Sequence, residues 1–141
     1  MKTLLLTTAL FVSLVPVASA QSSAVTTKNE SDGCRVIVET VSDKPVTDCA
    51  RLKATMKRSG DDIKDVQDCA LTGAMIYASN HFSSKDVADG VTAALEGRKS
   101  NVDIAPPLLV RQAIMRGCVM IIKDWPESDA DRVVKNIDWS R

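Results

Sequence analysis

The chain has 141 residues, and its 18 lysines and arginines balance 18 aspartates and glutamates. This length supplies the core of one ordinary domain and not of two. The balanced charge argues against a nucleic-acid-binding protein, which needs a clustered basic face. It also argues against a protein held at a membrane surface by a polybasic segment.

The first 20 residues have the three parts of a secretory signal peptide. Lys2 supplies the positive charge, residues 4–17 are mostly apolar, and Ala18-Ser19-Ala20 offers a small-x-small cleavage site. The apolar stretch is shorter than the roughly 20 residues of a membrane-spanning helix, so an uncleaved membrane anchor is the less favoured alternative. We expect a mature protein that begins at Gln21 and is periplasmic or secreted.

All four cysteines of the chain follow the expected cleavage site: Cys34, Cys49, Cys69 and Cys118. An even number of cysteines in an oxidising compartment indicates disulfides, here two. Three pairings are possible, and the sequence alone does not choose among them; we favour Cys34–Cys49 with Cys69–Cys118. These bridges would close loops worth roughly 3 and roughly 4 kcal/mol of unfolded-state entropy.

Residues 21–33 are polar and rich in serine, threonine and charged side chains, which predicts a flexible N-terminal arm. The next segment, residues 35–41, is β-branched and partly alternating. This pattern favours a short strand or hairpin, with the first turns of a helix as the alternative. Residues 42–45 predict a turn, after which Asp48 suits the N-cap of a short helix that runs to about Arg58.

A clear helical pattern begins at Asp61 and predicts a helix to about Phe82. Its apolar and small residues recur at intervals of three and four: Ile63, Val66, Ala70, Gly73, Tyr77 and His81. Ser83-Ser84-Lys85-Asp86 resembles a capping box that opens the next helix, with Gly97 at its end. The apolar stripe of that helix consists of Val87, Val91, Ala94 and Leu95.

Residues 98–104 form a polar connector, after which Pro106-Pro107 suits the start of a new helix. That helix, residues 108–124, is apolar on most sides, which is typical of the buried centre of a domain. A last short helix follows, and Trp139 is expected to fold back onto the core. We therefore expect one mainly α domain over residues 34–141, a disulfide-stapled bundle of four or five helices. The prediction allows one short strand or hairpin near the N-terminus in addition to these helices.

The residue types that carry catalysis or bind metals are sparse. His81 is the only histidine, the cysteines contain no C-x-x-C spacing, and no G-x-S-x-G sequence is present. A zinc site draws on several His or Cys ligands, and a serine or cysteine nucleophile would need His81 as its base. Paired aspartates such as Asp61-Asp62 stand at predicted helix starts, where the helix dipole accounts for them. We expect no enzyme, metal or cofactor, and interpret His81 as a partly buried residue at a helix end.

Recognition of another protein remains as the favoured function. The connector carries both charge signs on a loop between two helices, and its candidate binding residues are Arg98, Lys99, Asn101 and Asp103. An ordinary solvated loop is the alternative for this segment. Two alternatives remain for the whole protein: a secreted structural protein, or a carrier of a small apolar ligand. The carrier would use a pocket lined by Met115 and Met120, although methionine more often fills gaps in a core.

Three elements between Cys69 and Cys118 form a pattern of their own. They are a helix with Gly73 and Tyr77, Ser83-Ser84-Lys85-Asp86-Val87 opening a second helix, and Ala105-Pro106-Pro107-Leu108-Leu109-Val110-Arg111-Gln112-Ala113-Ile114 leading to Cys118. In these elements the chain resembles the helical, disulfide-bonded periplasmic immunity proteins that neutralise peptidoglycan amidases of type VI secretion systems. The resemblance implies a non-enzymatic inhibitor that plugs the active site of a cell-wall amidase, and it leaves a homodimer open. Where that family has a further cysteine and proline, this chain has His81-Phe82-Ser83.

Overall fold

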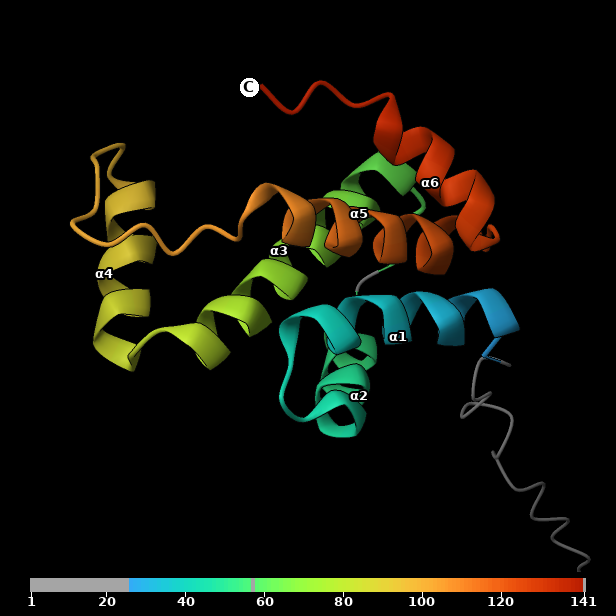
Figure 1. Cartoon of the computed structure of the whole chain (residues 1–141), viewed down its shortest axis with the longest axis horizontal. Helices are drawn as coiled ribbons and strands as arrows, with labels where there is room; N and C mark the ends of the chain where they lie inside the picture. The colour runs from blue at the N-terminus through green and yellow to red at the C-terminus, as the bar shows by residue number, and fades with distance from the viewer. Residues whose placement is uncertain (1–25, 57, 141) are drawn as a thin grey trace, which may run out of the picture.

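The computed structural model describes residues 26–56 and 58–140, which form six helices and no strand (Figure 1). The helices are α1 Lys28–Val41, α2 Pro45–Thr55, α3 Asp62–His81, α4 Ser84–Leu95, α5 Leu108–Lys123 and α6 Glu127–Lys135. The mainly α fold expected from the sequence is confirmed, with one helix more than the upper expected number. The expected signal peptide, residues 1–20, lies outside the described residues.

The segment at the start of the domain differs from its prediction. Residues 35–41, expected as a strand or hairpin, lie in α1, and so do residues 28–33 of the expected arm. The reason is a helical period that runs through both segments. Its buried members are Gly33, Cys34, Ile37, Val38 and Val41. Thr27 begins the helix, because its side chain accepts a hydrogen bond from the backbone N–H of Glu30 at 3.1 Å.

The helix α5 lies at the centre of the fold. It contacts α1, α3 and α6, and it runs antiparallel to α1 (Figure 1). Its buried residues come from most sides of the helix: Ala113, Ile114, Gly117, Cys118, Val119, Met120, Ile121 and Ile122. This burial is the reason for the all-round apolar sequence, since three helices cover α5.

The closest approach between α1 and α5 is made by two glycines. A Cβ atom added to Gly33 would lie 2.6 Å from the carbonyl oxygen of Gly117. In the reverse direction, a Cβ added to Gly117 would lie 2.6 Å from the carbonyl oxygen of Gly33 and would also meet Ile37. No side chain fits at such distances, so backbone packs directly on backbone at this crossing.

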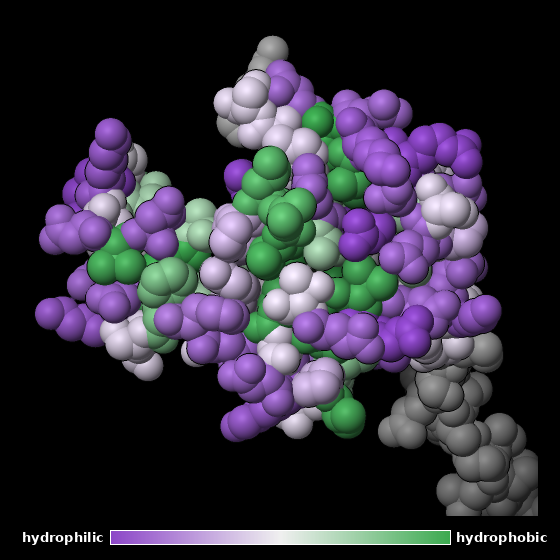
Figure 2. Space-filling model, in the orientation of Figure 1, coloured by the Kyte–Doolittle hydropathy of each residue, from purple (hydrophilic) through white to green (hydrophobic). Residues whose placement is uncertain are grey.

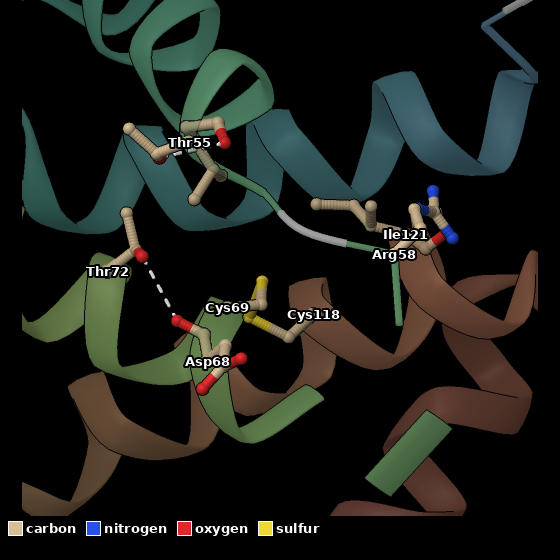
Figure 3. The surroundings of a disulfide bond; sticks show 8 residues. Thr55, Arg58, Asp68, Cys69, Thr72, Cys118 and Ile121 are labelled. Atoms are coloured by element: carbon tan, nitrogen blue, oxygen red, sulfur yellow. Dashed lines mark hydrogen bonds between the residues drawn. A yellow bond between two sulfur atoms is a disulfide. The ribbon is translucent and has the colours of Figure 1, made fainter. Parts of the chain in front are cut away.

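The C-terminal end of α5 is fixed by residues from the first half of the chain. Asp124, with a φ of 54°, ends the helix in the left-handed conformation. Its carboxylate accepts a hydrogen bond from the Thr27 hydroxyl at 2.8 Å, and its carbonyl accepts one from the Asn29 amide at 3.0 Å. Arg58 donates to the carbonyl oxygens of Ile121 and of the next residue, at 3.3 and 3.4 Å (Figure 3). These bonds satisfy carbonyls that a helix end otherwise leaves without partners.

Two disulfides connect the helices in the pairing that we favoured. Cys34–Cys49 joins α1 to α2. Cys69–Cys118 joins α3 to α5 (Figure 3), and the Cα atoms of each bridge are 5.8 Å apart. The bridges span 15 and 49 positions of the sequence. On the loop-entropy model, loops of these lengths stabilise the folded state by about 3 and about 4 kcal/mol.

The helix α4 stands apart from this body. Among the described helices it contacts α3 alone, and Figure 1 shows it projecting to the side of the α1–α3–α5 packing. The connector after it folds back along the helix, where a Cβ added to Gly90 would lie 2.8 Å from the side chain of Ile104. We call α4 and residues 96–107 the α4 lobe. Trp139 folds back as expected, and its indole N–H donates to the carbonyl of Val134 at 3.1 Å.

We predict that Gly117→Ala lowers the free energy of unfolding by about 1–3 kcal/mol, the usual cost of overpacking a core. The added methyl group would have to separate α1 from α5. The measurement is the free energy of unfolding in urea. Ser31→Ala, at an exposed position of the same helix pair, should change it by no more than about 0.5 kcal/mol. An alanine variant at Gly117 as stable as the parent would show that the two backbones are not in contact.

A second prediction concerns Asp65, which is buried at the start of α3 with 3% exposure. The Ser59 hydroxyl donates to its carboxylate at 2.6 Å and the Ser59 N–H at 3.0 Å, and these bonds lower the pKa of Asp65. The stabilisation is therefore complete above the unfolded-state pKa of roughly 3.9 and is lost as the pH falls through the lower native pKa.

Asp65→Asn should accordingly be less stable than the parent at neutral pH, with the difference shrinking as the parent carboxylate becomes protonated. Urea unfolding from neutral pH down to about pH 2 measures this. Ser59→Ala should show the same convergence, because it removes the hydroxyl that donates to the Asp65 carboxylate at 2.6 Å. A stability difference that is constant across the whole pH range would contradict this role of the carboxylate.

Candidate binding groove

A groove of about 780 Å³ lies between α3, α4 and the connector that leads to α5. We call it the α3–α4 groove. One wall is α3, which contributes Leu71, Ala74, Met75 and Ala78. These four positions are spaced i, i+3, i+4 and i+7, so they form a single stripe along the helix. Leu71 is 64% exposed, which shows that this apolar stripe is not covered over its whole length.

The second wall is the apolar stripe of α4. Residues Gly90, Val91, Ala93, Ala94 and Leu95 line the groove, and Leu95 is 83% exposed. Figure 2 shows hydrophobic side chains at the surface of the α4 lobe and again over the beginning of α5. In that second area the exposed residues are Leu108 and Leu109. The stripe predicted for this helix therefore faces the groove over part of its length and does not face the central core.

The connector supplies the third wall and three of the four candidate binding residues. Arg98, Lys99 and Asp103 line the α3–α4 groove and are exposed. Asn101 does not line it. This residue lies instead in a neighbouring polar hollow of about 340 Å³, which it shares with Arg98 and with acidic residues of α4. The structure thus brings three of the candidates to one apolar groove and places the fourth beside it.

The connector is ordered by hydrogen bonds within itself. Arg98 pairs with Glu96 at 2.5 Å, and the Ser100 hydroxyl accepts from the N–H of Val102 at 3.3 Å. Asp103 accepts from the N–H of Ala105 at 3.0 Å. The charged side chains therefore stand on a folded wall whose inner side is Val102 and Ile104, and the edge of the groove carries both charge signs.

The groove residues on α3 were missed because α3 carries two apolar faces. The predicted face includes Gly73, whose position packs against Ile114 of α5, but it also includes Ile63, which is 71% exposed. The second face, from Leu71 to Ala78, has the same helical spacing. The presence of two apolar faces on one helix could have revealed the groove, since such a helix needs a neighbour on each face.

His81 is the last residue of α3 and is exposed, not partly buried as expected. Its ring stacks on Tyr77 with 4.1 Å between ring centroids, and its Nδ1 lies 2.9 Å from the Tyr77 carbonyl oxygen. Phe82 meets the Tyr77 ring edge-on at 6.4 Å. These contacts account for the histidine as part of an aromatic cluster at the end of α3.

Met115 and Met120 fill gaps in the core, as we considered more common for methionine, and do not line the α3–α4 groove as the carrier alternative would need. Met120 is buried in a cluster with Val119 and Ala130, and Met115 packs against that cluster. Both methionines therefore belong to the packing of α5 against α1, α3 and α6. The methionine that lines the groove is Met75 of α3.

Within residues 26–56 and 58–140, no three His, Cys, Asp or Glu side chains gather in an arrangement that could hold a metal ion. All four cysteines are bridged. In the same described part of the chain, none of the helices combines the length and the hydropathy needed to cross a bilayer.

The chain was compared with protein-family models, with curated protein sequences and with solved structures, and none of the three comparisons found a match.

Proposed function

We propose that this is an exported, non-enzymatic binding protein that holds a segment of another protein in the α3–α4 groove. Its most concrete form is an inhibitor of a periplasmic or secreted cell-wall enzyme. The observation that carries the proposal is the pair of apolar stripes, from α3 and α4, that line the groove. Of the described helices, α4 contacts only α3, so no further helix packs onto both stripes. Apolar faces of this kind are normally covered, and an uncovered one marks an interaction site.

The charges at the edge of the groove support a protein partner. Protein–protein interfaces have an apolar centre and a polar rim, and rim charges select the partner and its orientation. Here Leu71 and Leu95 lie in the apolar part, while Arg98, Lys99 and Asp103 line the connector side. The exposed Leu108 and Leu109 at the start of α5 add a second apolar area, which does not line the groove itself.

The disulfides support a stiff binding surface. Cys69–Cys118 ties the α3 wall to the central helix α5, so α3 loses little conformational freedom when a partner binds. A non-enzymatic role is favoured by the same bridges, because a disulfide-bonded cysteine is not available as a nucleophile. The stacking of His81 on Tyr77 gives the single histidine a structural explanation.

We predict that Leu71→Asp and Leu95→Asp each weaken capture of the partner at least about tenfold, since a charge is placed in an apolar interface. Both residues are exposed, so the fold should remain intact. The measurement is quantitative mass spectrometry of proteins cross-linked to the exported chain in its natural compartment. The captured protein is then assayed for enzyme activity with and without the purified chain.

Arg51→Glu, on the exposed surface of α2 and outside the groove, is the matched control and should capture the partner as the parent does. Equal capture by the parent and by both aspartate variants would remove the groove from the proposal. A partner that depends on the groove but keeps full activity in the presence of the chain would remove the inhibitor form.

A carrier of a small apolar ligand is the second candidate, because the groove volume of about 780 Å³ falls in the range of small-ligand sites, about 300–1,000 Å³. We predict for this candidate that native mass spectrometry of the chain incubated with palmitate detects a one-to-one complex. Leu71→Asp should abolish that complex. Absence of any adduct to the parent chain, with a known fatty-acid-binding protein as positive control, would eliminate the carrier.

A further inference from the structure

A second hollow, of about 290 Å³, lies at the opposite end of the molecule from the α4 lobe, where α5 passes into α6 (Figure 1). Trp125 lines one side of it. The other lining residues all belong to α6 or follow it directly: Asp129, Arg132, Val133 and Asn136. Their spacing of i, i+3, i+4 and i+7 places them on one face of the helix, opposite the tryptophan. We call this the Trp125 hollow.

The tryptophan ring has a cation beside it and follows a fixed residue of the chain. Lys123 lies with its ammonium 5.4 Å from the ring centroid, and that ammonium is itself anchored by Asp62 at 2.6 Å. The preceding residue, Asp124, is fixed by its hydrogen bonds from Thr27 and Asn29. Trp125, which is 37% exposed as a residue, is thus oriented before any ligand arrives, and this lowers the entropy cost of stacking on its ring.

The polar groups opposite the ring are a carboxylate, a guanidinium and an amide. Asp129 and Arg132 form an ion pair at 3.1 Å, so the two charges offset each other and are ordered relative to one another. Asn136 adds an amide with both donor and acceptor capacity, and the side chain of Val133 is 36% exposed between them. The hollow therefore offers one apolar aromatic surface and several planar hydrogen-bonding groups, with little net charge.

We propose that the Trp125 hollow binds a neutral pyranose ring. A pyranose with equatorial hydroxyls has a flat face of C–H groups, which packs on the electron-rich face of an indole. Its hydroxyls lie around the edge, where Asp129 accepts, Arg132 donates and Asn136 does both. The volume of about 290 Å³ lies at the lower end of the range of small-ligand sites, which suits one sugar ring. A charged ligand is disfavoured, because it would disrupt the Asp129–Arg132 pair.

This site is independent of the proposed protein-binding role, since no residue is shared between the Trp125 hollow and the α3–α4 groove. An exported protein with both would hold a protein partner at one end and contact a saccharide at the other. Loss of either activity by mutation should leave the other unchanged.

The experiment uses the two tryptophans of the chain as probe and internal reference. The indole N–H of Trp139 is bonded to the Val134 carbonyl, whereas Trp125 lines the hollow. In a ¹⁵N NMR titration with methyl β-glucopyranoside, the indole signal of Trp125 should shift and that of Trp139 should not. For a ligand of this size we expect a Kd of about 1 mM. Sorbitol has hydroxyls but no flat ring, and it should bind at least about tenfold more weakly.

Trp125→Ala should abolish binding, and Asn136→Ala should weaken it at least about fivefold while the helical circular dichroism is retained. Trp139→Phe is the matched control and should bind as the parent does. No shift of the Trp125 signal in the parent would overturn the proposal. Equal affinity for sorbitol, or binding that survives in Trp125→Ala, would overturn it as well, because the site would then not depend on stacking.

Discussion

Where α1 crosses α5, the Cβ position of Gly33 lies 2.6 Å from the carbonyl oxygen of Gly117, so the two backbones touch. This approach brings Cys34 and Ile37 of α1 into the same core as Cys118 and Ile121 of α5. The bonds from Thr27 and Asn29 to Asp124 then fix how far one helix is shifted along the other. The helices α2, α3 and α6 each pack on this pair, which makes the crossing the element on which their positions depend.

The groove follows from what this packing leaves uncovered. The first face of α3 is used against α1 and α5, and its second face, with Leu71 and Met75, is left for the α4 lobe. That lobe covers the second face only in part. The connector packs along α4 through Gly90 and Ile104. The body of the protein is thus built around the close contact of α1 with α5. The α4 lobe is held less firmly, because α4 contacts α3 alone among the described helices.

Local signals predicted most helix boundaries after Asp61. Ser83 caps α4 as its capping box predicted and accepts a hydrogen bond from the N–H of Asp86, and Asp61, placed at the predicted start of α3, caps that helix. The helix over residues 28–41 was not predicted from such local signals. Val36, Ile37 and Val38 have the β-branched composition of a strand, so a strand was favoured there. What decides for the helix is the buried helical period that runs through both segments, with Gly33 packed against Gly117 of α5. The groove was missed because the spacing of Leu71 and Met75 shows an apolar face, and only the packing shows that the α4 lobe covers this face in part.

The bridge Cys69–Cys118 has one more consequence. Both ends of the α4 lobe lie inside the loop that this bridge closes, since α4 and the connector fall between the two cysteines. A protease that cuts the chain after the exposed Arg98 or Lys99 therefore leaves two fragments that are still covalently joined. The lobe can be nicked, or lengthened by insertion, while the two halves of the body remain one molecule until the disulfide is reduced.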